Sequence, residues 1–268
     1  MNGELALLGR ILTLAADEEV LIPDFSRTVG SSPNLAAQMV KVANSPLYGM
    51  EGRITRLERA VVILGVRTVA GIASSVLMAS HMKNSRLCTL PPNALWMHSL
   101  EMGACAELLA RSLGWPHEPE AYLAGLLHDL GTLNLFEEHG PRYCEQLQRA
   151  QRSQLDLAVC EREAFGHTHG ERLKQLGGQW GFPAGLCDVF EFHHRPLEAP
   201  EESRALVSLV YAAHLVVEQP TEGWSDQGPV AEVDRAILDQ LGLSSDDMGD
   251  VRALLEERLK DFQRALRP

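Results

Sequence analysis

The sequence lacks the features of disulfide-rich and nucleic-acid-binding proteins. Its five cysteines form no CxxC pair and leave an odd count, so we expect reduced thiols rather than a disulfide framework. Only 24 Lys and Arg residues oppose 36 Asp and Glu residues, which gives a formal net charge of −12. The arginines are scattered, and an acidic protein without a basic patch repels a polyphosphate backbone. The composition therefore disfavours nucleic acid as a partner.

No segment has the pattern of a targeting signal or of a membrane span. In the first twenty residues the apolar positions are spaced as in an amphipathic helix. The longest apolar stretch, Ala60 to Ser80, contains Arg67, two glycines and several small polar residues. A break near Gly65 followed by a buried helix explains this stretch better than membrane insertion does. We therefore expect a soluble, cytoplasmic protein.

No run of alternating apolar residues is bounded by turn dipeptides, so we expect strands to be few or absent. Apolar residues recur instead at helical spacing, as in 5–15 and in 35–43, where Pro33 after two serines marks a helix start. Further helices are predicted at 55–64, 67–82, 93–113, 118–130, 140–151, 155–164, 168–180, 184–193, 203–218, 230–241 and 246–266.

Two breaks suggest how the chain is organised. The segment 85–93 contains two prolines, and 218–229 has the composition of a surface loop. Ser244 or Ser245 would cap the last helix. We expect an all-α protein of two packed helical lobes, with an N-terminal lobe at 1–88 and a second lobe at 89–218. The loop and two helices of 219–268 would pack on the second lobe.

The histidines are numerous and unevenly placed. Five segments each carry one or two metal-competent side chains: His98, His128 with Asp129, His167 with His169, His193 with His194, and His214. Neighbouring residues on a helix point about 100° apart, so a dyad such as HD chelates only where other helices converge on it. Imidazole and carboxylate without thiolate suit iron, manganese, nickel or zinc, and a carboxylate can bridge two ions. Such an assembly is typical of metal-assisted phosphoester hydrolysis.

A structural interpretation stands beside this one. A single histidine on an apolar helix is commonly a hydrogen-bonded core or surface residue, and we assign His81, His117 and His139 to that class. The dyad at 128–129, expected within an apolar helix near its end, is harder to explain in this way. A buried ionised aspartate needs a partner. Spacing alone leaves both interpretations open.

Taken in order, these motifs resemble the HDOD domain family, bacterial relatives of the HD phosphohydrolases. SPNLAAQMVKVANSPLYG (32–49) resembles a family segment with an NS…Y signature, and ITRLERAVVILGVRTVAGI (54–72) resembles the next one. LWMHS, AGLLHDLG, GHTHGERL and FHHRP follow in family order, so the resemblance covers about residues 5–218. It implies an HD-like helical bundle for the second lobe.

The resemblance also implies a ligand set for one or two divalent metal ions, with iron, manganese and zinc as candidates. The matching positions are His98, His128, Asp129, His169, His193, His194 and His214. At the last of these, relatives have aspartate, so histidine there removes a negative charge. Spacing does not decide between His167 and His169, and the family match favours His169.

The signature residues Asn44, Ser45 and Tyr48 have two interpretations. Asn and Ser side chains bond nearby backbone groups, and the residue before Pro46 is disfavoured in a helix. The segment should therefore end one helix and shape a fixed turn. The alternative is a partner-binding loop.

Two departures from the enzymatic relatives concern substrate handling. Relatives that hydrolyse phosphoesters often have a lysine after the glycine of the HD motif, where this chain has Thr132. The sequence HHRPLEAP contains no GYP signature, unlike the cyclic-di-GMP phosphodiesterases. Without a cation there, an acidic protein binds a dianionic phosphate less readily.

Three hypotheses of function follow. The first is a non-catalytic signal-transduction module that acts through contacts with other signalling proteins, its HD pocket structural or metal-stiffened. The second is a metal-dependent phosphohydrolase acting on a nucleotide or another phosphoester, with Asp129 bridging two ions. The third is a sensor that binds a small nucleotide without chemistry.

Overall fold

All regular elements of the described residues are helices, as the sequence predicts. The computed structural model describes residues 2–17, 19–44, 53–82, 94–116, 118–217 and 231–266. Within these ranges, no helix combines the length and the apolar character needed to cross a membrane. The chain divides into two compact units: unit 1 contains Met1–His81 and Gly177–Pro183, and unit 2 contains Met82–Leu176 and Ala184–Pro268.

Unit 1 is a small helical bundle. Its core contains fully buried side chains such as Leu8, Phe25, Leu35 and Met39. Its helices are α1 (Asn2–Ala16), α2 (Ile22–Gly30), α3 (Pro33–Ala43), α4 (Leu57–Leu64) and nearly all of α5 (Val66–Met82). Of these, α2 was not predicted. Ser32 accepts a hydrogen bond from the Leu35 amide and caps α3, so Pro33 does mark its start.

A segment distant in the sequence also belongs to unit 1. A Cβ atom on Gly9 would lie 1.9 Å from the carbonyl oxygen of Trp180, so only glycine lets α1 approach this segment so closely. The hydroxyl of Thr13 donates to the carbonyl of Gly181 at the same contact. Residues 177–183 thus pack on α1 although they follow most of unit 2 in the sequence.

Asn44 joins two backbone segments of unit 1. Its side-chain amide donates to the carbonyls of Val40, at 2.9 Å, and Ile54, at 2.7 Å. Its side-chain oxygen accepts from the Ile54 amide at 2.9 Å. Asn44 therefore ends α3, as predicted, and ties this helix end to the backbone of Ile54. Ser45 and Tyr48 lie outside the described residues.

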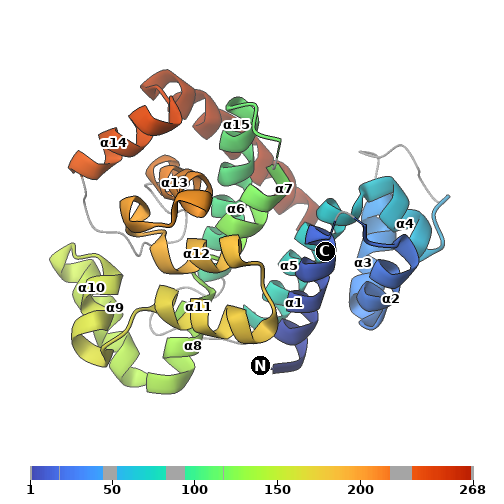
Figure 1. Cartoon of the computed structure of the whole chain (residues 1–268), viewed down its shortest axis with the longest axis horizontal. Helices are drawn as coiled ribbons and strands as arrows, with labels where there is room; N and C mark the ends of the chain where they lie inside the picture. Colours follow the sequence, from blue (N-terminus) through green and yellow to red (C-terminus); the bar gives the residue numbers. More distant parts are fainter. Residues whose placement is uncertain are drawn as a thin grey trace. The chain divides into compact units, whose positions relative to one another are not determined.

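Unit 2 is built around α6 (Ala94–Ser112), which packs on α7 (Glu118–Leu127), α13 (Glu201–Val216) and α15 (Ser245–Leu266) (Figure 1). Its other helices are α8 (Leu130–His139), α9 (Pro141–Ser153), α10 (Leu157–Phe165), most of α11 (His169–Trp180), α12 (Ala184–Phe192), the short η2 (Pro196–Glu198) and α14 (Ala231–Leu241). Ser244 and Asp247 cap α15 reciprocally, which confirms the predicted cap. The separate helix α8 was not predicted.

The cysteines differ in part from expectation. Cys105, Cys160 and Cys187 are buried thiols outside any disulfide, as small apolar side chains are. Cys144 is disulfide-bonded in the structure, so the expectation that every cysteine is a reduced thiol is wrong for this residue.

The hydrogen bonds of the Asn44 side chain to Val40 and Ile54, here called the Asn44 clamp, give a direct prediction about stability. In Asn44→Asp the carboxylate loses both donated bonds and faces two carbonyl oxygens, so the protein should be destabilised by about 1–3 kcal/mol. Asn34→Asp is the matched control, because this exposed residue in the first turn of α3 gains from a negative charge. Thermal unfolding of both variants would check this, and equal melting temperatures would contradict the clamp.

Candidate metal centre

Six imidazoles and one carboxylate from five segments of unit 2 meet in one buried cluster. Four of the seven side chains are fully buried, and none is more than 6% exposed. The residues are His98 on α6, His128 and Asp129 between α7 and α8, His169 at the start of α11, His193 and His194 after α12, and His214 on α13. We call this set the buried cluster.

The dyad of the buried cluster lies between two helices rather than within one. The predicted helix 118–130 ends at Leu127, and α8 begins at Leu130. Asp129 is the N-cap residue of α8, but its side chain makes no capping hydrogen bond. Because the chain changes direction here, His128 and Asp129 both reach the cluster, which the 100° spacing of a continuous helix opposes.

Two glycines allow the helices around the cluster to approach closely. A Cβ atom on Gly131 would lie 2.1 Å from the carbonyl oxygen of His169, and one on Gly170 would lie 2.2 Å from that of Phe190. No side chain fits at these separations. Glycine therefore lets the first turn of α8 contact the start of α11, and lets α11 contact α12.

Three imidazole nitrogens converge on one point beside Asp129. The Nε2 atom of His169 lies 3.1 Å from that of His193 and 3.2 Å from that of His194. It also lies 3.3 Å from Oδ1 of Asp129. Ligand atoms at about 2.1 Å from a zinc-like ion are about 3.0–3.4 Å apart. The separations of these atoms match those of ligands around one ion.

The opposite ring nitrogens of these histidines face oxygen acceptors. A proton on Nδ1 of His169 and of His193 satisfies the acceptor there and leaves the lone pair on Nε2, directed into the cluster. These hydrogen-bonded pairs are His169 Nδ1 with Glu161 Oε2 at 2.8 Å and His193 Nδ1 with the Phe190 carbonyl at 2.8 Å. His194 Nδ1 lies 3.0 Å from Asp156 Oδ2, a close contact without hydrogen-bond geometry.

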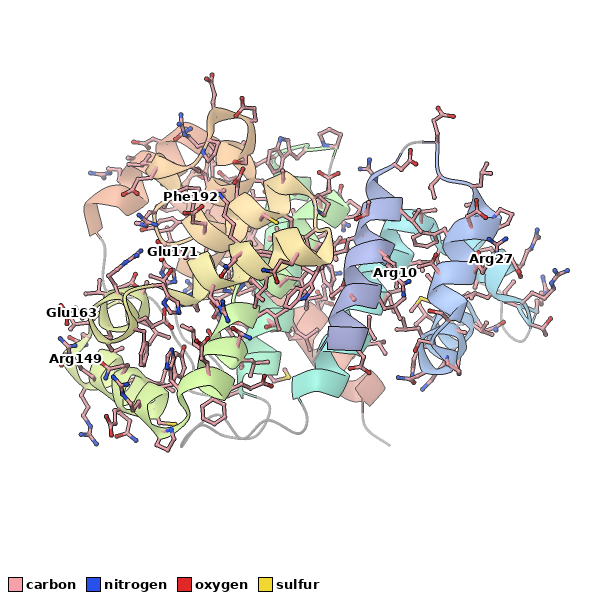
Figure 2. The ribbon with its side chains drawn as sticks, turned by 60° about the horizontal axis from the view of Figure 1, so that its bottom comes forward. Arg10, Arg27, Arg149, Glu163, Glu171 and Phe192 are labelled. Atoms are coloured by element: carbon pink, nitrogen blue, oxygen red, sulfur yellow. The ribbon has the colours of Figure 1, made fainter. Side chains whose placement is uncertain are left out.

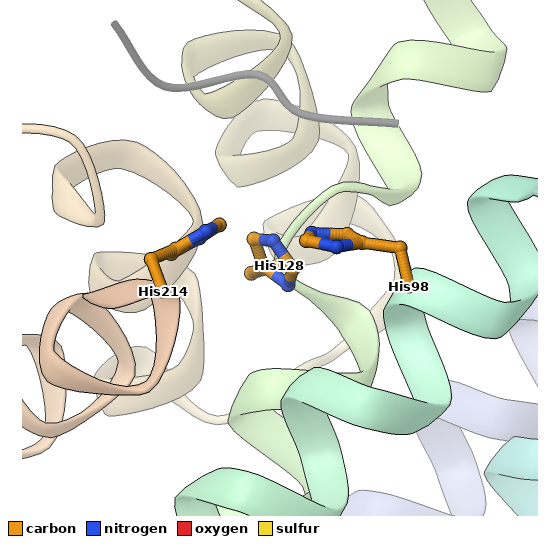
Figure 3. A group of neighbouring side chains, drawn as sticks. All are labelled: His98, His128 and His214. Carbon is orange, nitrogen blue, oxygen red and sulfur yellow. The ribbon is translucent and has the colours of Figure 1, made fainter. Parts of the chain in front are cut away.

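A second histidine group also lies beside Asp129. In Figure 3 the rings of His98 and His214 approach His128 from either side, and one ring nitrogen of each lies within 4.8 Å of the others. The Nδ1 atom of His128 is 2.7 Å from the Gly125 carbonyl. Its Nε2 atom is buried, has no hydrogen bond and lies 3.5 Å from Oδ1 of Asp129. A lone pair facing a buried carboxylate fits a cation between them.

Three supporting residues were missed by the sequence analysis. Asp156 caps α10, and buried Glu161 accepts hydrogen bonds from the backbone and ring of His169 and from the Tyr143 hydroxyl. The available signal was weak: Glu161 shares the buried face of its helix with Leu157 and Cys160. A carboxylate in an apolar stripe is the pattern that could have identified it.

Burial and neighbouring charges shift the pKa values of two histidines of the cluster in opposite directions. Burial opposes protonation of His169, but Glu161 and Asp129 outweigh it and raise the pKa of His169 well above its usual value. Burial, followed by the neighbouring imidazoles His194, His128 and His169, lowers the pKa of His193 well below its usual value. The cluster thus contains one imidazole that favours a positive charge beside another that resists it.

The two histidines of GHTHGERL separate in the structure. His169 lies in the buried cluster, and His167 lies with Glu138 and His139 in another group. All seven positions implied by the resemblance are therefore brought together.

The donor set suits a divalent transition metal, because imidazoles and a carboxylate without thiolate fit iron, manganese or zinc. Two histidine triads lie beside Asp129: His98, His128 and His214 form one, and His169, His193 and His194 form the other. His128, Asp129 and His193 form a third group that could hold an ion, and it joins the two triads.

Comparison with known families identifies the chain. The model of the HDOD domain matches residues 6–196. The chain belongs to the HDOD family. The matched residues include six of the seven members of the buried cluster, and His214 lies beyond the end of the match.

Solved structures share the HDOD fold along nearly the whole chain. An HDOD domain protein of unknown function from Geobacter sulfurreducens is 25% identical, with a TM-score of 0.75 and coverage of 97% of this chain and 90% of that one. A candidate signal transduction protein from Marinobacter aquaeolei VT8 is also 25% identical, with a TM-score of 0.76 and coverage of 97% and 57%. A candidate phosphohydrolase from Shewanella amazonensis SB2B has a TM-score of 0.69 at 21% identity, with coverage of 94% and 88%, and shows the fold alone.

Among curated proteins, an uncharacterized protein from Treponema pallidum (strain Nichols) is 24% identical over 230 residues. The match covers 85% of this chain but 43% of that protein, so the chain spans less than half of its relative's length.

The close helix approach at the cluster can be tested by adding one methyl group. Gly131→Ala forces a Cβ atom against the His169 carbonyl, so the melting temperature should fall, with a loss of about 1–3 kcal/mol in unfolding free energy. Gly249→Ala is the control, because nothing lies within 4 Å of a Cβ atom there and alanine favours the helix α15. A Gly131→Ala variant as stable as the control would contradict this packing.

The support that Glu161 gives to His169 should appear in metal affinity. Glu161→Gln removes the acceptor charge behind the ring, so affinity for the divalent ion should fall about 10- to 100-fold. Glu163→Gln is the matched control on the same helix, where Glu163 pairs with Arg149 at the outer edge of unit 2 (Figure 2). Equilibrium dialysis with zinc would measure both, and equal affinities would contradict the role of Glu161.

Proposed function

We propose that this HDOD protein is a non-catalytic signal-transduction module whose buried cluster holds one or two divalent metal ions. The ions would tie together α6, α11, α13 and the turns after α7 and α12, and so stiffen the core of unit 2. Its output would be contacts with other signalling proteins. The similarity to a candidate signal transduction protein supports this assignment.

The observation that carries the proposal is the burial of the cluster. His128, Asp129, His169 and His193 have no exposed surface, and their neighbours have almost none. A phosphoester carries charge and bulk, so it reaches such a site only if the surrounding helices open. A small cation needs much less room.

The residues at the positions that handle substrate in the enzymatic relatives also support a non-catalytic role. Thr132, which stands where the enzymatic relatives often have lysine, is fully buried on α8. Ring nitrogens of four histidines lie 3.3–3.8 Å from the Asp129 carboxylate. A cluster of imidazoles with one carboxylate offers a metal its ligands, and it contains no lysine or arginine to bind a phosphate.

The second candidate is a metal-dependent phosphohydrolase, and the pair of triads beside Asp129 favours it. Two ions bridged by a carboxylate can activate a water molecule and stabilise charge on phosphorus-bound oxygens. In that case His98, His128 and His214 would hold one ion and the other three histidines the second.

The two candidates separate in one experiment on the full chain. The protein is loaded with iron, manganese or zinc and assayed on phosphomonoesters, phosphodiesters and cyclic dinucleotides, beside Asp129→Asn. We expect a metal-dependent rise in melting temperature that is lost in the variant, and equal background turnover in both. Turnover by the metal-loaded protein that disappears in Asp129→Asn would overturn the non-catalytic proposal.

A further inference from the structure

A second group of metal-competent side chains lies outside the buried cluster. It consists of Glu138 and His139 at the end of α8 and His167 in the connection between α10 and α11, and we call it the α8-end site. One ligand atom of each residue lies within 4.8 Å of the others. Glu138 is exposed, and the two histidines are partly buried. None of the three belongs to the buried cluster.

The His139 ring of the α8-end site is held in place, and both histidines have a ring nitrogen without a partner. His139 stacks on Phe165 with ring centroids 4.0 Å apart and an interplanar angle of 5°. The Nε2 atoms of both His139 and His167 are shielded from solvent and make no hydrogen bond. A shielded imidazole nitrogen without a partner is costly, and a metal ion satisfies it directly.

The geometry and the charge around the site suit a cation. An ion at the centre of a triangle with 4.8 Å sides lies about 2.8 Å from each corner, so each ligand moves inward by less than about 1 Å to reach bonding distance. His139 is the last residue of α8, where the helix dipole favours positive charge. Arg172 pairs with one oxygen of Glu138, at 3.2 Å, and opposes a cation there. The other carboxylate oxygen is not part of that pair.

Space for water ligands lies beside the site. A cavity of about 410 Å³ is lined by His167, Glu171, Arg172 and Gln175. Zinc with three protein ligands keeps a fourth position for water. This cavity can supply that water molecule next to His167.

We propose that Glu138, His139 and His167 form a separate site for a divalent transition-metal ion with zinc-like preferences. Its ligands are two imidazoles and one carboxylate, a set that zinc, nickel and cobalt accept. A bound ion ties the end of α8 to the residues that precede His169. The proposal is independent of the function proposed above, because it shares no ligand with the buried cluster.

The test is a zinc titration of the stripped full-length chain against a chromophoric chelator, which counts sites and their affinities. Glu138→Gln and His167→Gln should each lose one site relative to the wild type, or weaken it at least about tenfold. Glu137→Gln is the matched control, because this exposed carboxylate precedes Glu138 on α8 and lies outside the group. The buried cluster contributes equally to all four proteins, so the difference between them reports the α8-end site alone.

A second measurement guards against a change in fold. Circular dichroism of each variant without metal should match the wild type, since all substituted side chains are partly or fully exposed. Cobalt absorption should then show one fewer nitrogen-ligated ion in His167→Gln than in Glu137→Gln. Folded variants that bind zinc with the same number of sites and the same affinities as the wild type would overturn the proposal.

Discussion

The buried carboxylate of Asp129 is the constraint on which the rest of unit 2 depends. It lies 3.3–3.8 Å from ring nitrogens of His98, His128, His169 and His193, away from water. An ionised carboxylate in such a place is costly unless positive charge or donated hydrogen bonds compensate for it. Either a protonated imidazole such as His169 or a bound cation supplies that compensation, and the packing of five segments brings both options to the same point.

The helix ends explain how the cluster is assembled. Asp129, His169 and the pair at 193–194 lie at or next to the ends of helices, where the backbone changes direction. Tight contacts at Gly131 and Gly170 set the distances between these ends. Glu161 fixes the orientation of the His169 ring, and Asp156 lies 3.0 Å from the His194 ring. The site is therefore a product of packing as much as of its ligands, which is consistent with a stiffening role.

The fold class and the family could be predicted from the sequence, because helical periodicity and ordered motifs are local signals. The boundary at Leu127 could not, since an apolar run does not show where a helix is interrupted. The same limit hid α8 as a separate helix. Glu161 was missed because it lies in no motif, and residues 177–183 were missed as part of unit 1 because their partner, α1, is far away in the sequence. The helix end at Asn44 was predicted, because the signal lies in neighbouring residues of the sequence.

The most direct test of the account is an anomalous-scattering crystal structure of the chain after loading with iron or zinc. The account predicts an ion at about 2.0–2.2 Å from the Nε2 atoms of His169, His193 and His194, with the Asp129 carboxylate among its ligands. Crystals of the loaded protein with no anomalous peak in the buried cluster, its rings hydrogen-bonded only to one another, would contradict it.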